Sequence, residues 1–298
     1  MKFRTIANTG KLIAFLAVIS LASCKKDGTS SNSNESNAAN LTDSSTAADN
    51  MYYDVLNNAF VGFSDNSSVW NTSTPHSGQT TTFSTGVEGT ATNLGCAIYS
   101  IDDTIPGEYP KTLTLDFGTG CTSADGILRK GKLIYLFSGP LLVPGATAAV
   151  TFDQYVVNGY GILGTYAITN NSSDVLGISF TTQVTNGIIT YPNASNYHYN
   201  ANKTYTMTAG SVTPFDISDD VYSVSGNSSF SSSNGSSLVC TVTTPLVKAV
   251  TCHNVSAGVV SFVYDQVVNG TLDFGNGTCD NQATLKIGAN ITRTITLR

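Results

Sequence analysis

Charged residues are scarce in this chain. Only 11% of its 298 residues are Asp, Glu, Lys or Arg, and only three of the acidic residues are glutamates. Long surface helices and coiled coils use such residues on their exposed faces and in ion pairs between neighbouring turns. The composition therefore excludes helical bundles and coiled coils.

Recognisable catalytic motifs are also missing. The chain contains no HExxH, GxSxG or complete Walker sequence. Its three histidines, His76, His198 and His253, lie far apart in the sequence, which favours structural hydrogen bonding over a shared catalytic site. We therefore predict no catalytic residue and no cofactor from motifs.

Uncharged polar residues are abundant instead: Ser, Thr and Asn make up 100 residues, and 27 more are Gly. Thr, Val, Ile and Tyr suit strands, whereas Gly and Asn suit turns. Strand-like runs follow one another to the C-terminus, and no long helical pattern lies between them to make parallel crossovers. We expect an all-β fold, a mostly antiparallel sandwich or a twisted, partly rolled sheet with at most one or two short helices.

The N-terminus has the layout of a signal peptide. Lys2, Arg4 and Lys11 precede or flank an apolar run over residues 12–22, which is too short to span a bilayer as a finished helix. The run ends in Leu-Ala-Ser-Cys24, which resembles the bacterial lipobox, whose cysteine is acylated before cleavage. We expect residues 1–23 to be removed and Cys24 to carry lipid; the alternative is an ordinary cysteine beside a conventional cleavage site.

The expected mature chain divides into a tether and one domain. Residues 24–50 are rich in Ser, Thr and Asn and have Leu41 as their one large apolar side chain, so we expect a disordered tether. Met51, Val55, Leu56, Ala59 and Phe60 recur at near-helical spacing and predict a short helix. Residues 51–298 are expected to form the all-β domain.

An internal repeat runs through this domain, covering about residues 96–137 and 252–297. Thr-Leu-Asp-Phe-Gly-Thr-Gly-Cys at 114–121 recurs as Thr-Leu-Asp-Phe-Gly-Asn-Gly-Thr-Cys at 271–279. Each copy predicts a strand that runs into a glycine turn. The aspartates of the two copies, Asp116 and Asp273, are expected to cap backbone N–H groups.

The repeat also suggests a disulfide pattern. Besides Cys24 the chain has five cysteines, so at least one is unpaired. In an oxidising compartment the repeat favours two bridges and leaves Cys240 as a buried thiol; the bridges are Cys96 with Cys121 and Cys252 with Cys279. The rival pairing joins Cys240 to Cys252 across a hairpin and leaves Cys279 unpaired.

Together, the Ser-Cys-Lys-Lys-Asp start, the Ser/Asn-rich segment and the paired Leu-Asp-Phe-Gly-x-Gly-Cys turns resemble a group of Bacteroidota lipoproteins that has no established activity. The resemblance implies an outer-membrane lipoprotein, periplasmic or surface-exposed, with a β-rich domain. In that phylum Asp103-Thr104-Ile105 is similar to an O-glycosylation signal, which would place a glycan on Thr104.

Charge argues against nucleic acid as a partner. Removal of residues 1–23 leaves 11 basic and 20 acidic groups, a formal net charge of −9, whereas binding to phosphates needs clustered cations. The densest basic group, Arg129, Lys130 and Lys132, is interpreted as a solvated strand end, with an anion site as the alternative. The expected partners are the membrane, through the lipid, and a polysaccharide or an envelope protein.

Three side-chain groups are candidates for a functional site. Tyr197 and Tyr199 would share one face of a strand and, with Tyr191 and Tyr205, present rings to a sugar; cross-strand aromatic packing is the alternative. Calcium is a candidate ligand for oxygen atoms around the second glycine turn, from Asp273, Asn276 and Asp280.

The third candidate is a pair of aspartates, Asp116 and Asp273, that would act on a glycan or peptide bond. Our functional hypothesis is a lipid-anchored cell-envelope protein acting as a non-catalytic binding or structural module, with glycans among the expected ligands. The alternative is an envelope hydrolase that works through aspartates.

Overall fold

The computed structural model describes residues 29–65, 96–102, 108–173, 177–213, 216–288 and 291–297. These residues form one long helix and one antiparallel sheet of strand order β1-β2-β4-β5 and so on in sequence to β14, with the two-residue strand β3 pairing with β4. The expectation of an all-β, mostly antiparallel fold is confirmed. The strands are β1 (Ile98–Asp102), β2 (Lys111–Asp116), β3 (Cys121–Thr122), β4 (Leu128–Phe137), β5 (Thr147–Val157), β6 (Tyr160–Asn170), β7 (Ser179–Thr190), β8 (Asn196–Ala209), β9 (Val221–Ser232), β10 (Ser237–Ala249), β11 (Ala257–Tyr264), β12 (Val268–Asn276), β13 (Gln282–Ile287) and β14 (Ile291–Thr296), and the 3₁₀ helix η1 (Ile217–Asp219) precedes β9.

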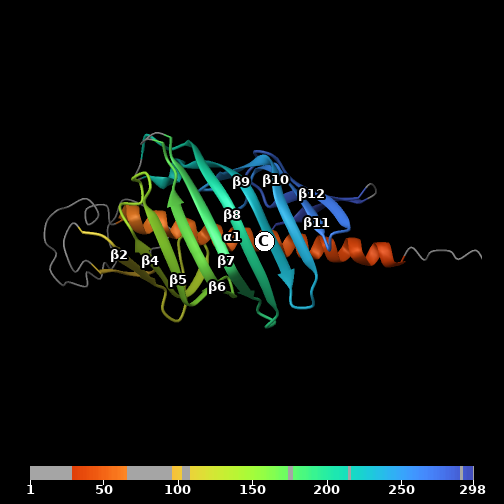
Figure 1. The fold of residues 1–298 in the computed structure, drawn as a ribbon, viewed down its shortest axis with the longest axis horizontal. Coiled ribbons are helices and arrows are strands. Elements are labelled where there is room, and N and C mark those ends of the chain that lie inside the picture. Colours follow the sequence, from red (N-terminus) through yellow and green to blue (C-terminus); the bar gives the residue numbers. More distant parts are fainter. Residues whose placement is uncertain are drawn as a thin grey trace, which may run out of the picture.

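The helix α1 (Thr29–Asp65) is 37 residues long and crosses the strands on one face of the sheet, which we call the inner face (Figure 1). Its contacts reach strands that are far apart in the sheet. The Tyr135 hydroxyl of β4 donates to the carbonyl of Val55 at 2.8 Å, and Ser45 lies 3.8 Å from the sulfur of Cys240 on β10. One helix therefore fills the concave side of the rolled sheet.

This helix corrects the expected tether and the expected short helix. Residues 29–50 are helical, and within them Ala38, Ala39, Leu41, Ala47 and Ala48 are buried. The polar composition suggested disorder because large apolar side chains are nearly absent. Small alanines nevertheless let the sheet approach the helix backbone closely, and tertiary packing rather than intrinsic propensity stabilises most protein helices.

The sheet wraps the second half of α1. Between Met51 and Val61 every residue is buried except Tyr53 and Asn57, which are partly exposed. A helix that is covered on all sides must satisfy its own polar groups. The side-chain N–H groups of Asn58 do so by donating to the backbone carbonyl and the carboxylate of Asp54, at 2.7 and 3.0 Å.

Glycine-containing bulges allow the sheet to curl. At Gly131 of β4 the backbone φ is +78°, and a Cβ atom would lie 2.2 Å from the carbonyl oxygen of Gln154 on β5. Gly226 of β9 has φ +122°, and a Cβ there would lie 2.1 Å from the carbonyl oxygen of Asn202. Such bulges increase the local twist, so the strands bend around α1 rather than lying flat.

The repeat and its bridges are confirmed. Disulfides join Cys96 to Cys121 and Cys252 to Cys279, with Cα separations of 5.9 and 5.6 Å, and Cys240 is a buried free thiol. The carboxylates of Asp116 and Asp273 accept hydrogen bonds from the N–H groups two residues later, at 2.8 and 2.9 Å. The two aspartates therefore cap equivalent turns.

Candidate functional site

A buried ionic network joins the helix to the sheet, and it corrects the interpretation of Arg129 as solvated. Arg129 is 0% exposed; its Nε atom donates to Asp54 of α1 at 3.0 Å, and a terminal nitrogen donates to Asp125 at 2.7 Å. Tyr155 also donates to Asp54, at 2.8 Å. Burial opposes the charge on Arg129, but the attraction and hydrogen bonds of the two carboxylates outweigh it and raise its pKa. No ligand atom is needed to satisfy this network, so it is structural.

The four tyrosines proposed as a sugar platform face the helix side of the sheet or its aromatic cluster. Tyr199 stacks on Tyr52 of α1 with 5.0 Å between ring centroids, and Tyr205 is 7% exposed. Tyr197 packs between Tyr191 and Phe230. Because side chains alternate along β8, the aromatic residues point inward, and the even-numbered residues between them face the opposite, outer face. The expected exposed platform is wrong, and cross-strand aromatic packing is the observed arrangement.

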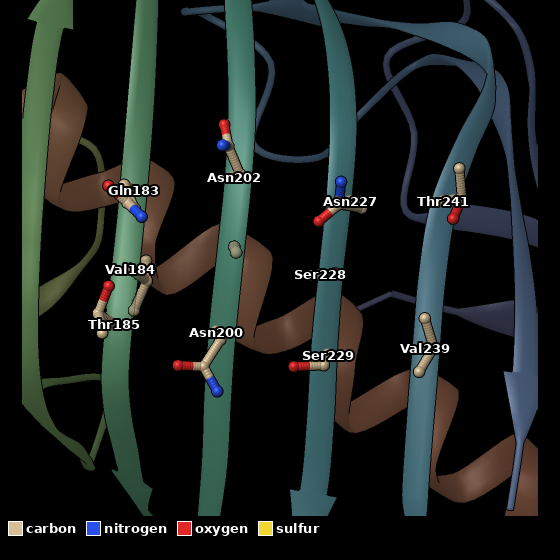
Figure 2. Close-up of a pocket in the computed structure, with 11 residues that line it drawn as sticks. Gln183, Val184, Thr185, Asn200, Asn202, Asn227, Ser228, Ser229, Val239 and Thr241 are labelled. Carbon is tan, nitrogen blue, oxygen red and sulfur yellow. The ribbon is translucent and has the colours of Figure 1, made fainter.

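The outer face of the same strands carries an open hollow of about 500 Å³. Figure 2 shows eleven lining residues, which come from the four adjacent strands β7, β8, β9 and β10. Amide and hydroxyl side chains dominate it, and none of the lining residues is charged or aromatic. They are Gln183, Val184, Thr185, Asn200, Ala201, Asn202, Asn227, Ser228, Ser229, Val239 and Thr241.

Strand register aligns the polar side chains into a row. Gln183 pairs with Asn202, Asn202 with Asn227, and Asn227 with Thr241. Neighbouring strands lie about 4.8 Å apart, so this row spans about 14 Å across the sheet. Asn200, Ser229 and Val239 form a second row two residues further along each strand.

The hollow exists because of the two-residue period of the strands. Between the two rows lie Val184, Ala201 and Ser228, which are buried and leave the outer face to the peptide backbone. Both rows therefore rise around a floor of main chain, as the sticks in Figure 2 show. A ligand in the hollow would meet amides on one side and, at Val239, an aliphatic side chain that is 52% exposed.

The amides of the first row have unused hydrogen-bonding capacity. Among the described residues, the side chains of Gln183, Asn202 and Asn227 make no hydrogen bond, whereas Asn200 accepts one from the N–H of Asn186 at 2.8 Å. A side-chain amide offers two donors and an acceptor with two lone pairs. The nearest lysine in sequence, Lys203, points inward and pairs with Asp49 at 3.4 Å, so the hollow stays neutral.

The proposed calcium ligands are used within their own turns. Asp273 accepts from Gly275, Asp280 from Gln282 at 2.9 Å, and Asn276 from Thr278 at 3.0 Å. No group of three or more His, Cys, Asp or Glu side chains that could hold a metal lies in the described part of the chain.

The proposed catalytic pair is not assembled. Asp116 lies on β2 and Asp273 on β12, which are nine places apart in the strand order, and Asp116 forms an ion pair with Lys132 at 2.9 Å. Cys24 and Thr104, the expected lipidation and glycosylation sites, lie outside the described residues. Within the described ranges, no helix combines the length and the apolarity that crossing a membrane requires.

The fold and site together define an antiparallel sheet rolled around a helix, with a neutral, amide-lined hollow on its outer face. Comparisons with protein-family models, curated proteins and solved structures found no match to this chain.

Proposed function

We propose that this protein is a lipid-anchored component of the cell envelope and that its β-domain is a non-catalytic module that binds a neutral polysaccharide in the outer hollow. The lipobox-like sequence ending at Cys24 supports the anchor. Two disulfides support an oxidising compartment such as the periplasm or the cell surface.

The aligned row of Gln183, Asn202 and Asn227 is the observation that carries the binding proposal. Asn is depleted in strands because its side chain competes for backbone hydrogen bonds. Here two asparagines and a glutamine face one another across three long strands, and their side chains stay unpaired. A departure from local preference at one aligned place is typical of a functional surface.

The chemistry of the hollow fits sugar hydroxyls. A hydroxyl both donates and accepts hydrogen bonds, as does a side-chain amide, and Val239 offers an aliphatic contact for a C–H face of a sugar ring. Since the lining residues are uncharged and the whole chain has a formal net charge of −6, uncharged polysaccharides are favoured over acidic ones.

Binding of the purified protein to a panel of neutral and acidic polysaccharides tests this proposal, with both retention and released sugar measured. The double substitution Asn202→Ala and Asn227→Ala is expected to weaken binding by about fivefold or more, because each of the two lost hydrogen bonds contributes about 0.5 to 1.5 kcal/mol. Asn269→Ala on β12 is the matched control: this amide is exposed, lies outside the hollow and should leave affinity unchanged. Equal affinity of the double variant and the parent would refute the site, and release of sugar would favour the hydrolase.

A further inference from the structure

The position at which helix α1 begins limits how far the domain can lie from a membrane to which Cys24 is anchored. Helix α1 begins at Thr29, so only Lys25, Lys26, Asp27 and Gly28 separate it from Cys24. Five Cα-to-Cα steps of a fully extended chain span at most about 18 Å. A disordered tether of 26 residues would instead have had a mean reach of about 25 to 30 Å and free rotation.

Helix α1 is fixed within the domain at several points along its length, so it cannot act as a swinging arm. Ser45 contacts Cys240 of β10, Asn50 donates to Asn254 at 2.9 Å, and Asp54 is held by Arg129 of β4. The direction in which the helix leaves the sheet therefore restricts which end of the domain can approach an anchored N-terminus.

The N-terminal end of α1 emerges at the side of the sheet formed by the last strands. The helix lies close to β12 and β13, and its N-terminal end extends past the blue strands in Figure 1. Gly62, near the other end, lies against Leu113 of β2. The strands β11 to β14 are thus the ones nearest the proposed lipid attachment, and β1 to β4 are the farthest.

We infer that the domain sits directly against the lipid bilayer, with the β11 to β14 end toward the headgroups and the β1 to β4 end pointing away. This inference rests on the proposed lipid anchor at Cys24. It assigns a lipid surface as the partner of one end of the molecule, and it leaves the amide-lined hollow, on strands β7 to β10, between the two ends.

Resonance energy transfer on the full lipidated chain tests the placement. The protein is reconstituted into vesicles of phosphatidylethanolamine and phosphatidylglycerol that contain a headgroup-labelled acceptor dye. A fluorescent amino acid is encoded either at Asn34, exposed near the start of α1, or at Leu136, 47% exposed on β4. Asn34 and Gly62 are about 42 Å apart along the helix axis, and Leu136 pairs with Thr112 beside Leu113.

Transfer from position 34 is expected to be at least threefold more efficient than from position 136. A 40-residue Gly/Ser insertion between Asp27 and Gly28 is the control, since a flexible linker of that length has a mean reach of about 35 Å and should remove most of the difference. Equal transfer from both positions in chains that float with the vesicles would overturn the placement while the anchor stands. A chain that does not float with the vesicles overturns both the anchor and the placement.

Discussion

Individual buried polar residues decide how the helix and the sheet fit together. Arg129 forms ion pairs with Asp54 and Asp125 and donates to Ser123 inside the protein. Lys132, on the same strand, pairs with Asp116 at the surface, where 42% of the lysine side chain is exposed. These two ion pairs have the same charges but different solvent access. Since water screens the surface pair, the buried pair should matter far more for stability.

Substitution of each cation measures this difference. Arg129→Met should lower the free energy of unfolding by about 3 to 5 kcal/mol, because Asp54 would remain buried without its cation. Lys132→Met, the matched control, should leave the free energy of unfolding nearly unchanged, because water screens this exposed pair. Urea unfolding at neutral pH gives both values, and the double variant Asp54→Leu with Arg129→Met should recover part of the loss. Similar values for the two single variants would mean that Arg129 is solvated.

At the scale of elements, the sequence predicted what local chemistry determines. Both disulfides and the two aspartate-capped turns follow from residues within each repeat, and most strands follow from β-branched and aromatic runs. Residues 223–232 of β9 carry little strand signal because Ser dominates them, and the first half of α1 carries no hydrophobic pattern because most of its apolar residues are alanines. Both depend on packing against distant segments. The row of Gln183, Asn202 and Asn227 forms only when their strands pair in the observed register. No single segment of the sequence determines that register.

The contribution of each disulfide to stability can be measured separately. Each bridge closes a loop of 25 or 27 residues, for which the chain-entropy model gives about 3.5 kcal/mol. Replacing Cys96 and Cys121 by Ser should lower stability by about that amount, as should replacing Cys252 and Cys279. Thermal unfolding without reductant measures both.

The reactivity of the free cysteine tests the assigned disulfide pairing. Burial raises the pKa of Cys240 to about 12, so iodoacetamide should label it only after the protein is unfolded. Peptide mapping without reductant should recover the two repeat-related bridges and an alkylated Cys240 peptide. A bridged Cys240–Cys252 peptide would contradict the assignment.

For the whole molecule, a single sheet rolled on one helix places several ionisable groups in the interior, so global stability should depend on pH near neutrality. Lys248 is 4% exposed and contacts the ring of Tyr53. Its amine donates hydrogen bonds to the backbone carbonyls of Cys252 and His253. A neutral amine has two hydrogens, which are enough for these two bonds. Burial lowers the pKa of Lys248 to about 7, although the negative charge of Asp54 acts to raise it. Burial raises the pKa of Asp220, which accepts from Tyr222 at 3.0 Å, to about 6.

The two shifts act in opposite directions. Between pH 4 and 6 the folded state binds more protons at Asp220 than the unfolded state, so stability should fall as pH rises. Between pH 7 and 8 the unfolded state binds more protons at Lys248, so stability should rise with pH by at most about 1.4 kcal/mol per unit. Above about pH 8.5 the thiol of Cys240 ionises in the unfolded state but not in the folded state, which opposes this rise. The free energy of unfolding should therefore pass through a minimum between pH 6 and 7, measured by urea unfolding across this range.

Lys248→Met should abolish the rise in stability above pH 7, and Asp220→Asn should abolish the fall in stability below pH 6. Lys130→Met, at an exposed site on β4, is the control and should preserve both. A Lys248→Met profile that still rises above pH 7 would show that Lys248 stays charged in the folded protein.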